Sequence, residues 1–202
     1  IRDRADPIQF GVKSQVTKED TSPQLTPEGI RKIQEVVGTF GWYSRATDPT
    51  MEKKTLSSIA SRQSKATQQL REEVNWFLDY CATHPDAMVR YHASDMILQV
   101  ESDAAYLVSP NARSRAGGYH YLGDEANTTF NAPVFVQAKV IKNVMASAAE
   151  AEVAALYLNA QEALPIRQCL IEMGHPQPPT QMNTDNQTAT GILNGTIKQR
   201  SS

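Results

Sequence analysis

The stretch Met-Ile-Leu-Gln-Val-Glu-Ser-Asp, residues 96–103, carries the clearest strand signal in the chain. Its even positions are mostly apolar and its odd positions are mostly polar. Successive side chains of a strand point to opposite faces of a sheet, so this alternation predicts a β-strand with one face on a core. The segment ends in Asp103, which places a carboxylate at the end of the predicted strand.

The residues that follow predict a mixed α/β domain over residues 88–202. Alternation recurs twice after the first strand, and an alanine-rich segment with a helical stripe comes next. The stripe consists of Val153, Leu156, Ala160 and Leu164. The expected elements are strands at 96–103, 117–122 and 133–141, a helix at 149–164, a strand at 181–184 and a helix at 188–199. The polar stretch 109–116 is expected to be a loop.

The first half of the chain predicts helices. Thr26-Pro27-Glu28 has the hydroxyl cap, first-turn proline and first-turn acid of a helix start. Apolar residues then recur at helical spacing, and two further helices are expected, one opening at Asp48-Pro49 and one over residues 65–82. Trp42 and Trp76 are expected near the contact between the helices. We therefore divide the chain into a linker at 1–25, a helical segment at 26–87 and the α/β domain.

Composition excludes several classes of protein. The 202 residues carry 20 Lys and Arg against 22 Asp and Glu, a net charge of -2, which excludes a histone-like basic binder. No apolar run approaches the roughly 18 residues of a membrane span. Cys81 and Cys169 have no partners at zinc-binding spacing, and we expect both thiols to be buried.

Acidic residues stand at the ends of the predicted elements. Asp103 ends the first strand, Glu150 and Glu152 open the long helix, and Asp185 follows the short strand. Carboxylates that converge from such positions can hold hard divalent cations, which prefer oxygen ligands. Glu150 and Glu152 lie two positions apart, so they cannot both face one site. Periodicity alone leaves open which of them is the ligand.

Four local patterns resemble the ribonuclease H of copia-type LTR retrotransposon polyproteins. They are Ser102-Asp103-Ala104, residues 113–119 (Arg-Ser-Arg-Ala-Gly-Gly-Tyr), residues 147–156 (Ser-Ala-Ala-Glu-Ala-Glu-Val-Ala-Ala-Leu) and Thr184-Asp185-Asn186. Residues 36–43 and 45–49 are similar to the segment after the polymerase palm of the same polyproteins. The resemblance therefore covers about residues 28–200.

This resemblance implies a ribonuclease H-like mixed sheet, β-β-β-α-β-α, behind the helical thumb or connection segment of a reverse transcriptase. The implied reaction hydrolyses the RNA strand of an RNA–DNA hybrid, with two Mg²⁺ ions, or Mn²⁺, held by Asp103, Glu152 and Asp185. Glu152 is preferred over Glu150 because the family ligand directly precedes the first apolar residue of the buried stripe. Glu150 stays the alternative, as a charge that stabilises the helix N-terminus.

The resemblance also implies partners and surroundings. Asn186, Arg113 and Arg115 are candidate contacts to the hybrid, with a turn or a solvated loop as the alternatives. The polymerase domain of the same polyprotein would be a partner, in a cytoplasmic virus-like particle or the nucleus. The family has a fourth carboxylate in a region that would follow Ser202, so the domain is expected to be incomplete at its C-terminus. Alternative interpretations are an inactive remnant, a connection-like nucleic-acid scaffold and an integrase-like nuclease core.

Overall fold

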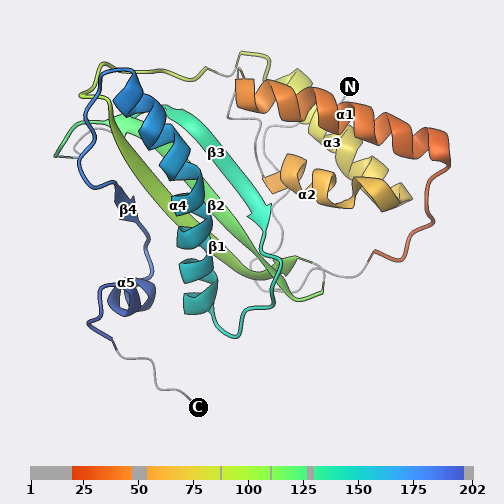
Figure 1. The fold of residues 1–202 in the computed structure, drawn as a ribbon. Coiled ribbons are helices and arrows are strands. Elements are labelled where there is room, and N and C mark those ends of the chain that lie inside the picture. Colours follow the sequence, from red (N-terminus) through yellow and green to blue (C-terminus); the bar gives the residue numbers. More distant parts are fainter. Residues whose placement is uncertain (1–19, 47–53, 87, 110, 127–129, 198–202) are drawn as a thin grey trace. The chain divides into compact units, whose positions relative to one another are not determined.

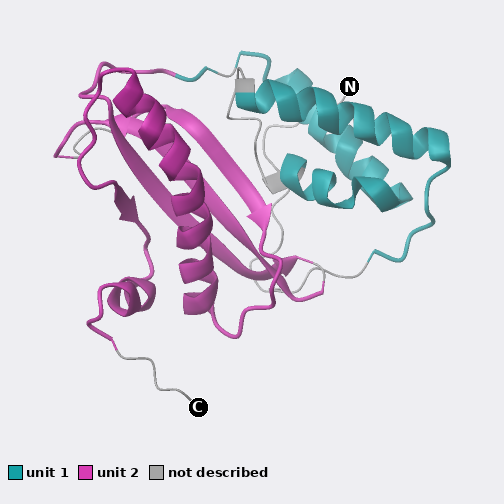
Figure 2. Cartoon of the chain, in the orientation of Figure 1, with its two compact units in different colours: residues 1–89 teal, residues 90–202 magenta. Residues whose placement is uncertain are grey.

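The computed structural model describes residues 20–46, 54–86, 88–109, 111–126 and 130–197 (Figure 1). The chain divides into two compact units, residues 1–89 and 90–202 (Figure 2). Within the described residues, the first unit is helical and the second is mixed α/β. Each unit has its own apolar core.

The first unit consists of α1 (Pro27–Ala46), α2 (Lys54–Arg62), the short 3₁₀ helix η2 (Gln63–Lys65) and α3 (Gln68–Thr83). The predicted start of α1 is confirmed, since the Thr26 hydroxyl accepts a hydrogen bond from the Gly29 N–H at 3.3 Å. The predicted helix over 65–82 is confirmed with a start at Gln68. The expected opening of the second helix at Asp48-Pro49 lies outside the described residues.

Apolar stripes of the three helices form the core of this unit. The buried members include Ile33, Leu56, Ile59, Leu70, Val74 and Phe77. Trp76 is buried as expected, but Trp42 is 69% exposed, so the prediction for Trp42 was wrong. Trp42 follows Phe40 by two positions, which places it on the other side of α1 from the ring that packs against Phe77.

A four-stranded mixed sheet is the centre of the second unit. Its strands are β1 (Ile97–Ser109), β2 (Arg113–Gly123), β3 (Pro133–Val140) and β4 (Gln181–Asn183). Their spatial order is β3-β2-β1-β4. β1 is antiparallel to β2, β2 is antiparallel to β3, and β4 is parallel to β1. The predicted order of strands and helices is confirmed, together with a mixed α/β fold.

The long helix α4 (Ala148–Glu172) covers one face of this sheet, and the short helix α5 (Gln187–Leu193) follows β4 (Figure 1). Two apolar clusters fill the space between α4 and the sheet. One cluster contains Ala116, Ile141, Met145, Ala151 and Ala155. The other contains Leu98, Val100, Ala163 and Leu170. The even positions of β1 thus face the core, as the alternation predicts.

The β1–β2 hairpin is longer than the sequence pattern predicts. The stretch 109–116, expected to be a loop, lies largely in β2, where Arg115 pairs with Ala105 and Arg113 with Ser109. The placement of Arg113 and Arg115 in a loop was therefore wrong. A strand with polar side chains lacks the apolar alternation by which a strand is predicted, but its backbone can still form the hydrogen bonds of a sheet.

Helix α4 also exceeds its predicted length, continuing through Pro165 to Glu172. Proline removes one backbone hydrogen bond, but Leu170 beyond it is buried against the sheet, and this packing sustains the last turns. Leu164 is 67% exposed, so its predicted place on the buried stripe was wrong.

Cys169 is exposed and Cys81 half-buried, which contradicts the expected burial of both thiols. The predicted last helix ends early, at Leu193, and residues 198–199 lie outside the described part.

Candidate metal centre

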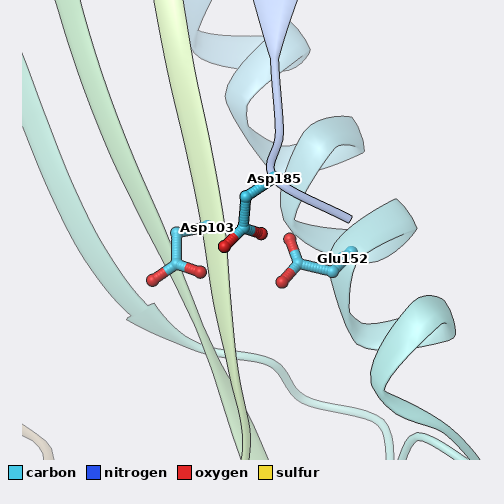
Figure 3. Close-up of side chains that lie close together, drawn as sticks. All are labelled: Asp103, Glu152 and Asp185. Atoms are coloured by element: carbon cyan, nitrogen blue, oxygen red, sulfur yellow. The ribbon is translucent and has the colours of Figure 1, made fainter. Parts of the chain in front are cut away.

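Three carboxylates from three separate elements meet beside α4. Asp103 belongs to β1, Glu152 to the second turn of α4 and Asp185 to the segment between β4 and α5. One oxygen of each lies within 4.8 Å of the others. Figure 3 shows the three side chains directed toward one another. The structure thus brings together the three acids that the resemblance singles out.

Glu152 is the buried member of this cluster, with 5% of its surface exposed. Its carboxylate accepts a hydrogen bond from the Ala104 N–H at 3.2 Å and another from the Thr184 hydroxyl at 3.2 Å. Ala104 directly follows Asp103, and Thr184 directly precedes Asp185. Glu152 therefore binds the neighbours of both other acids and links α4 to the two segments that carry them.

Glu150 has a different place. Its carboxylate accepts a hydrogen bond from the Ala146 N–H at 2.6 Å, and its own N–H donates to the Ser147 hydroxyl at 3.1 Å. These two bonds cap the first turn of α4, where a negative charge is favourable. The acid cluster contains Glu152 and not Glu150. The contacts of Glu150 agree with the alternative interpretation, in which its charge stabilises the helix N-terminus.

Electrostatics make the cluster a strained arrangement of like charges. Burial raises the pKa of Glu152, and the charges of Asp103 and Asp185 raise it further. The hydrogen bonds from Ala104 and Thr184 oppose this shift in pKa because they favour the charged carboxylate. A cation between the three groups would remove the repulsion, and this is one reason the site fits a metal.

The donor set also fits a hard divalent cation. All three ligand atoms are carboxylate oxygens, the type that Mg²⁺ and Mn²⁺ prefer. Ligands on opposite sides of one Mg²⁺ stand about 4.2 Å apart, given metal–oxygen distances of about 2.1 Å. Adjacent ligands stand about 3.0 Å apart, so oxygens within 4.8 Å of one another would have to move closer by side-chain rotation to bind one ion. Asp103 and Asp185 are exposed, so the cluster is open to solvent on their side.

The other predicted contact residues have structural partners. The Asn186 side chain accepts a hydrogen bond from the Ala189 N–H at 2.9 Å and caps α5, so it is a helix cap beside the acid cluster. Arg113 donates to the Lys142 carbonyl. Arg115 is 7% exposed and buried within the sheet.

Sequence reasoning missed Asn159, a fully buried polar residue of α4. It contacts His120, whose ring is fully buried. Asn159 follows Glu152 by about two helical turns and so lies on the same face of α4. That spacing was the available signal, because it puts an amide on the helix face that carries the candidate ligand.

Comparison with protein-family models, curated proteins and solved structures finds no match for this chain. Among the helices of the described residues, none combines the length and apolar character needed to cross a membrane. The acid cluster and the sequence motifs are therefore the features of this chain that bear on its function.

Proposed function

We propose that this chain is a metal-dependent nuclease of the ribonuclease H type, which hydrolyses the RNA strand of an RNA–DNA hybrid. The observation that carries the proposal is the convergence of Asp103, Glu152 and Asp185 within 4.8 Å. The element that bears each acid, first strand, long helix and end of the fourth strand, agrees with the resemblance to the copia-type retrotransposon enzymes. The helices of the first unit would then be the thumb or connection segment of the reverse transcriptase.

The three acids would hold Mg²⁺ or Mn²⁺, and two such ions, when bound, supply Lewis-acid catalysis for in-line displacement at phosphorus. Glu152 is fixed by its two hydrogen bonds and would keep one ligand oxygen in place. Asp103 and Asp185 are exposed and would face the incoming phosphate. Without cations, three carboxylates repel a phosphodiester, so cation and substrate should bind cooperatively.

Hybrid cleavage tests the proposal. The wild-type chain, Asp103→Asn and Glu150→Gln would each be incubated with a hybrid whose RNA strand is end-labelled, in Mg²⁺ at fixed salt. We expect at most slow cleavage by the wild type, because the resemblance implies a fourth carboxylate that this chain lacks. Glu150→Gln should cleave at the same rate, and Asp103→Asn should not cleave at all, because only Asp103 belongs to the cluster. Single-stranded RNA and duplex DNA should remain intact, since a hybrid is recognised by its shape and its 2′-hydroxyls.

Two outcomes would contradict this function. Equal cleavage by the wild type and Asp103→Asn would show that the acid cluster is not the site of reaction. Hybrid binding without cleavage in either metal would favour the inactive remnant or the connection-like scaffold. The contacts of Arg113 and the burial of Arg115 speak against a scaffold that uses these two residues to hold phosphates.

A further inference from the structure

A layer of buried polar residues crosses the interface between α4 and the sheet. It consists of Asn159 from α4, Ser102 from β1, His120 from β2 and Gln137 from β3, which are between 0% and 6% exposed. The apolar cluster around Ala116 and Ala155 contains none of them, nor does the cluster around Leu98 and Leu170. The layer is therefore a polar contact in an otherwise apolar interface.

Asn159 is the centre of this layer. Its Nδ2 donates to the Ser102 hydroxyl at 2.9 Å and to the Gly117 carbonyl at 2.8 Å. Its Oδ1 contacts Gln137 Nε2 and lies 3.2 Å from His120 Nε2. A carbonyl can only accept a hydrogen bond, so the bond to Gly117 fixes the orientation of the amide. It follows that His120 Nε2 carries the proton and donates to Asn159.

The sheet is shaped to receive this side chain. A Cβ atom on Gly118 would overlap Asn159 Oδ1, so glycine is required there for the amide to reach the strands. The layer is not optimised for stability, because His120 Nδ1 and Gln137 Oε1 have no hydrogen-bond partner among the described residues. Buried polar groups that are partly unpaired cost stability, whereas a buried asparagine can fix the register of packed elements.

We propose that Asn159 sets the position of α4 along the sheet and is thereby a positioning residue for the metal centre proposed above, on which this inference rests. Asn159 binds Ser102, and Glu152 binds the Ala104 N–H, so the helix is attached to β1 on both sides of Asp103. The two attachments are about two turns apart on one face of α4.

Apolar packing alone would hold this register weakly. Of the five buried apolar side chains of α4, three are alanines (Ala151, Ala155 and Ala163) and two are leucines (Leu156 and Leu170). Small side chains offer shallow ridges, and a helix lined by them can shift along its partner with little loss of contact. The directional bonds of Asn159 supply the register that these alanines do not.

Amide hydrogen exchange of the metal-free protein tests the positioning directly. The Ala104 N–H donates to Glu152, and the Leu98 N–H donates to the Gln177 side chain at 3.0 Å, which makes Leu98 the matched reference on the same strand. In Asn159→Ala, the ratio of the Ala104 exchange rate to the Leu98 rate should rise at least about tenfold, as expected when Glu152 moves away. Leu170→Ala opens a cavity beside Leu98, in the same apolar cluster, and should therefore not raise the ratio.

Metal binding supplies the second readout, with Mn²⁺ alone as the probe and electron paramagnetic resonance as the method. We expect Asn159→Ala to weaken Mn²⁺ binding about 10-fold or more, the scale of outer-shell substitutions in metal sites, and Leu170→Ala to bind as the wild type does. If the wild type and Asp103→Asn bind Mn²⁺ equally, the proposed function fails, while the exchange ratio still tests Asn159.

The inference about Asn159 is overturned if Asn159→Ala and Leu170→Ala give the same exchange ratio. If Asn159→Ala does not fold, Ser102→Ala takes its place, because it removes only the bond between Asn159 and β1 beside Asp103. Ser102→Ala should raise the exchange ratio several-fold. An unchanged ratio in that variant contradicts the proposal.

Discussion

Replacement of Glu152 by glutamine should stabilise the metal-free protein, although the residue is buried and hydrogen-bonded. Glutamine has nearly the same shape as glutamate. Its amide oxygen can accept the hydrogen bond from the Ala104 N–H, and its amide nitrogen can donate to the Thr184 hydroxyl, so both present contacts have a counterpart. The substitution therefore removes a charge from the cluster and keeps the packing.

Coulomb repulsion sets the size of this effect. Two unit charges 4.8 Å apart repel by about 0.9 kcal/mol at the dielectric constant of water and by about 3.5 kcal/mol at an effective value of 20. Asp103 and Asp185 are exposed, so both of their pairs with Glu152 lie near the lower value. We expect Glu152→Gln to raise the free energy of unfolding of the second unit by about 1–2 kcal/mol at pH 7.

The gain should depend on pH in a defined direction. Because folding raises the pKa of Glu152, the native wild type binds the proton more tightly than the unfolded chain does. Its stability therefore falls as pH rises from the ordinary pKa of a glutamate through the raised pKa. Below that interval, Glu152 is protonated in both states and the variant should match the wild type. Above it, the full difference should be present.

Urea unfolding in a chelator, from pH 4 to pH 8, would measure this difference. Both tryptophans lie in the first unit, so their fluorescence reports the unfolding of that unit, and the change in circular dichroism that the fluorescence does not follow reports the second unit. The control is Glu150→Gln, which removes a charge from the first turn of α4 and should lose up to about 1 kcal/mol. A Glu152→Gln variant less stable than the wild type at pH 7 would refute the electrostatic argument.

Four further predictions concern the metal centre, the core of the first unit, the cap of α5 and the segment at residues 84–96. Saturating Mg²⁺ should raise the melting temperature of the wild type and not of Asp103→Asn in calorimetry; an equal shift would place the ion elsewhere. Phe77→Ala should destabilise the first unit by about 3–5 kcal/mol in urea unfolding, the cost of a large core cavity. Asn186→Ala should lose about 1 kcal/mol with the cap of α5 and leave Mg²⁺ affinity within threefold, unless Asn186 is itself a ligand. Subtilisin should cut first within residues 84–96, which contain no helix or strand among the described residues, and earlier cuts inside α3 would contradict the division into units.

The strand-helix order of the second unit could be predicted because its signals are local. Alternation over 96–103 and the alanine-rich run after Ser147 identify β1 and α4 without any knowledge of tertiary contacts. Their ends could not be predicted in the same way. Ser114 and Arg115 are polar and yet buried in β2, and Pro165 lies inside α4, because pairing and packing outweigh local preference at those positions.

The acids of the candidate site could be predicted from the sequence, but Asn159 could not. The residue types and the family resemblance identify Asp103 and Asp185, and the two-residue spacing of the glutamates means that one of them must face away. The resemblance already preferred Glu152 over Glu150, and the contacts of Glu152 with Ala104 and Thr184, which only the fold brings together, agree with that preference. Asn159 was missed because its spacing from Glu152 indicates only a shared helix face. Its partners Ser102, His120 and Gln137 lie on three strands that are far away in sequence.

The position of Asp185 depends on the element with the weakest sequence signal. β4 pairs with β1 over Gln99, Val100 and Glu101 only, which is little to fix a strand at an edge. The Gln177 side chain extends this pairing, since its Oε1 accepts from the Leu98 N–H at 3.0 Å and its Nε2 donates to the Met96 carbonyl at 2.8 Å. An amide side chain offers a strand edge the donor and the acceptor that a backbone would offer. Gln177 thereby holds the segment that leads into β4 against β1, and the short strand can deliver its carboxylate beside Asp103 and Glu152.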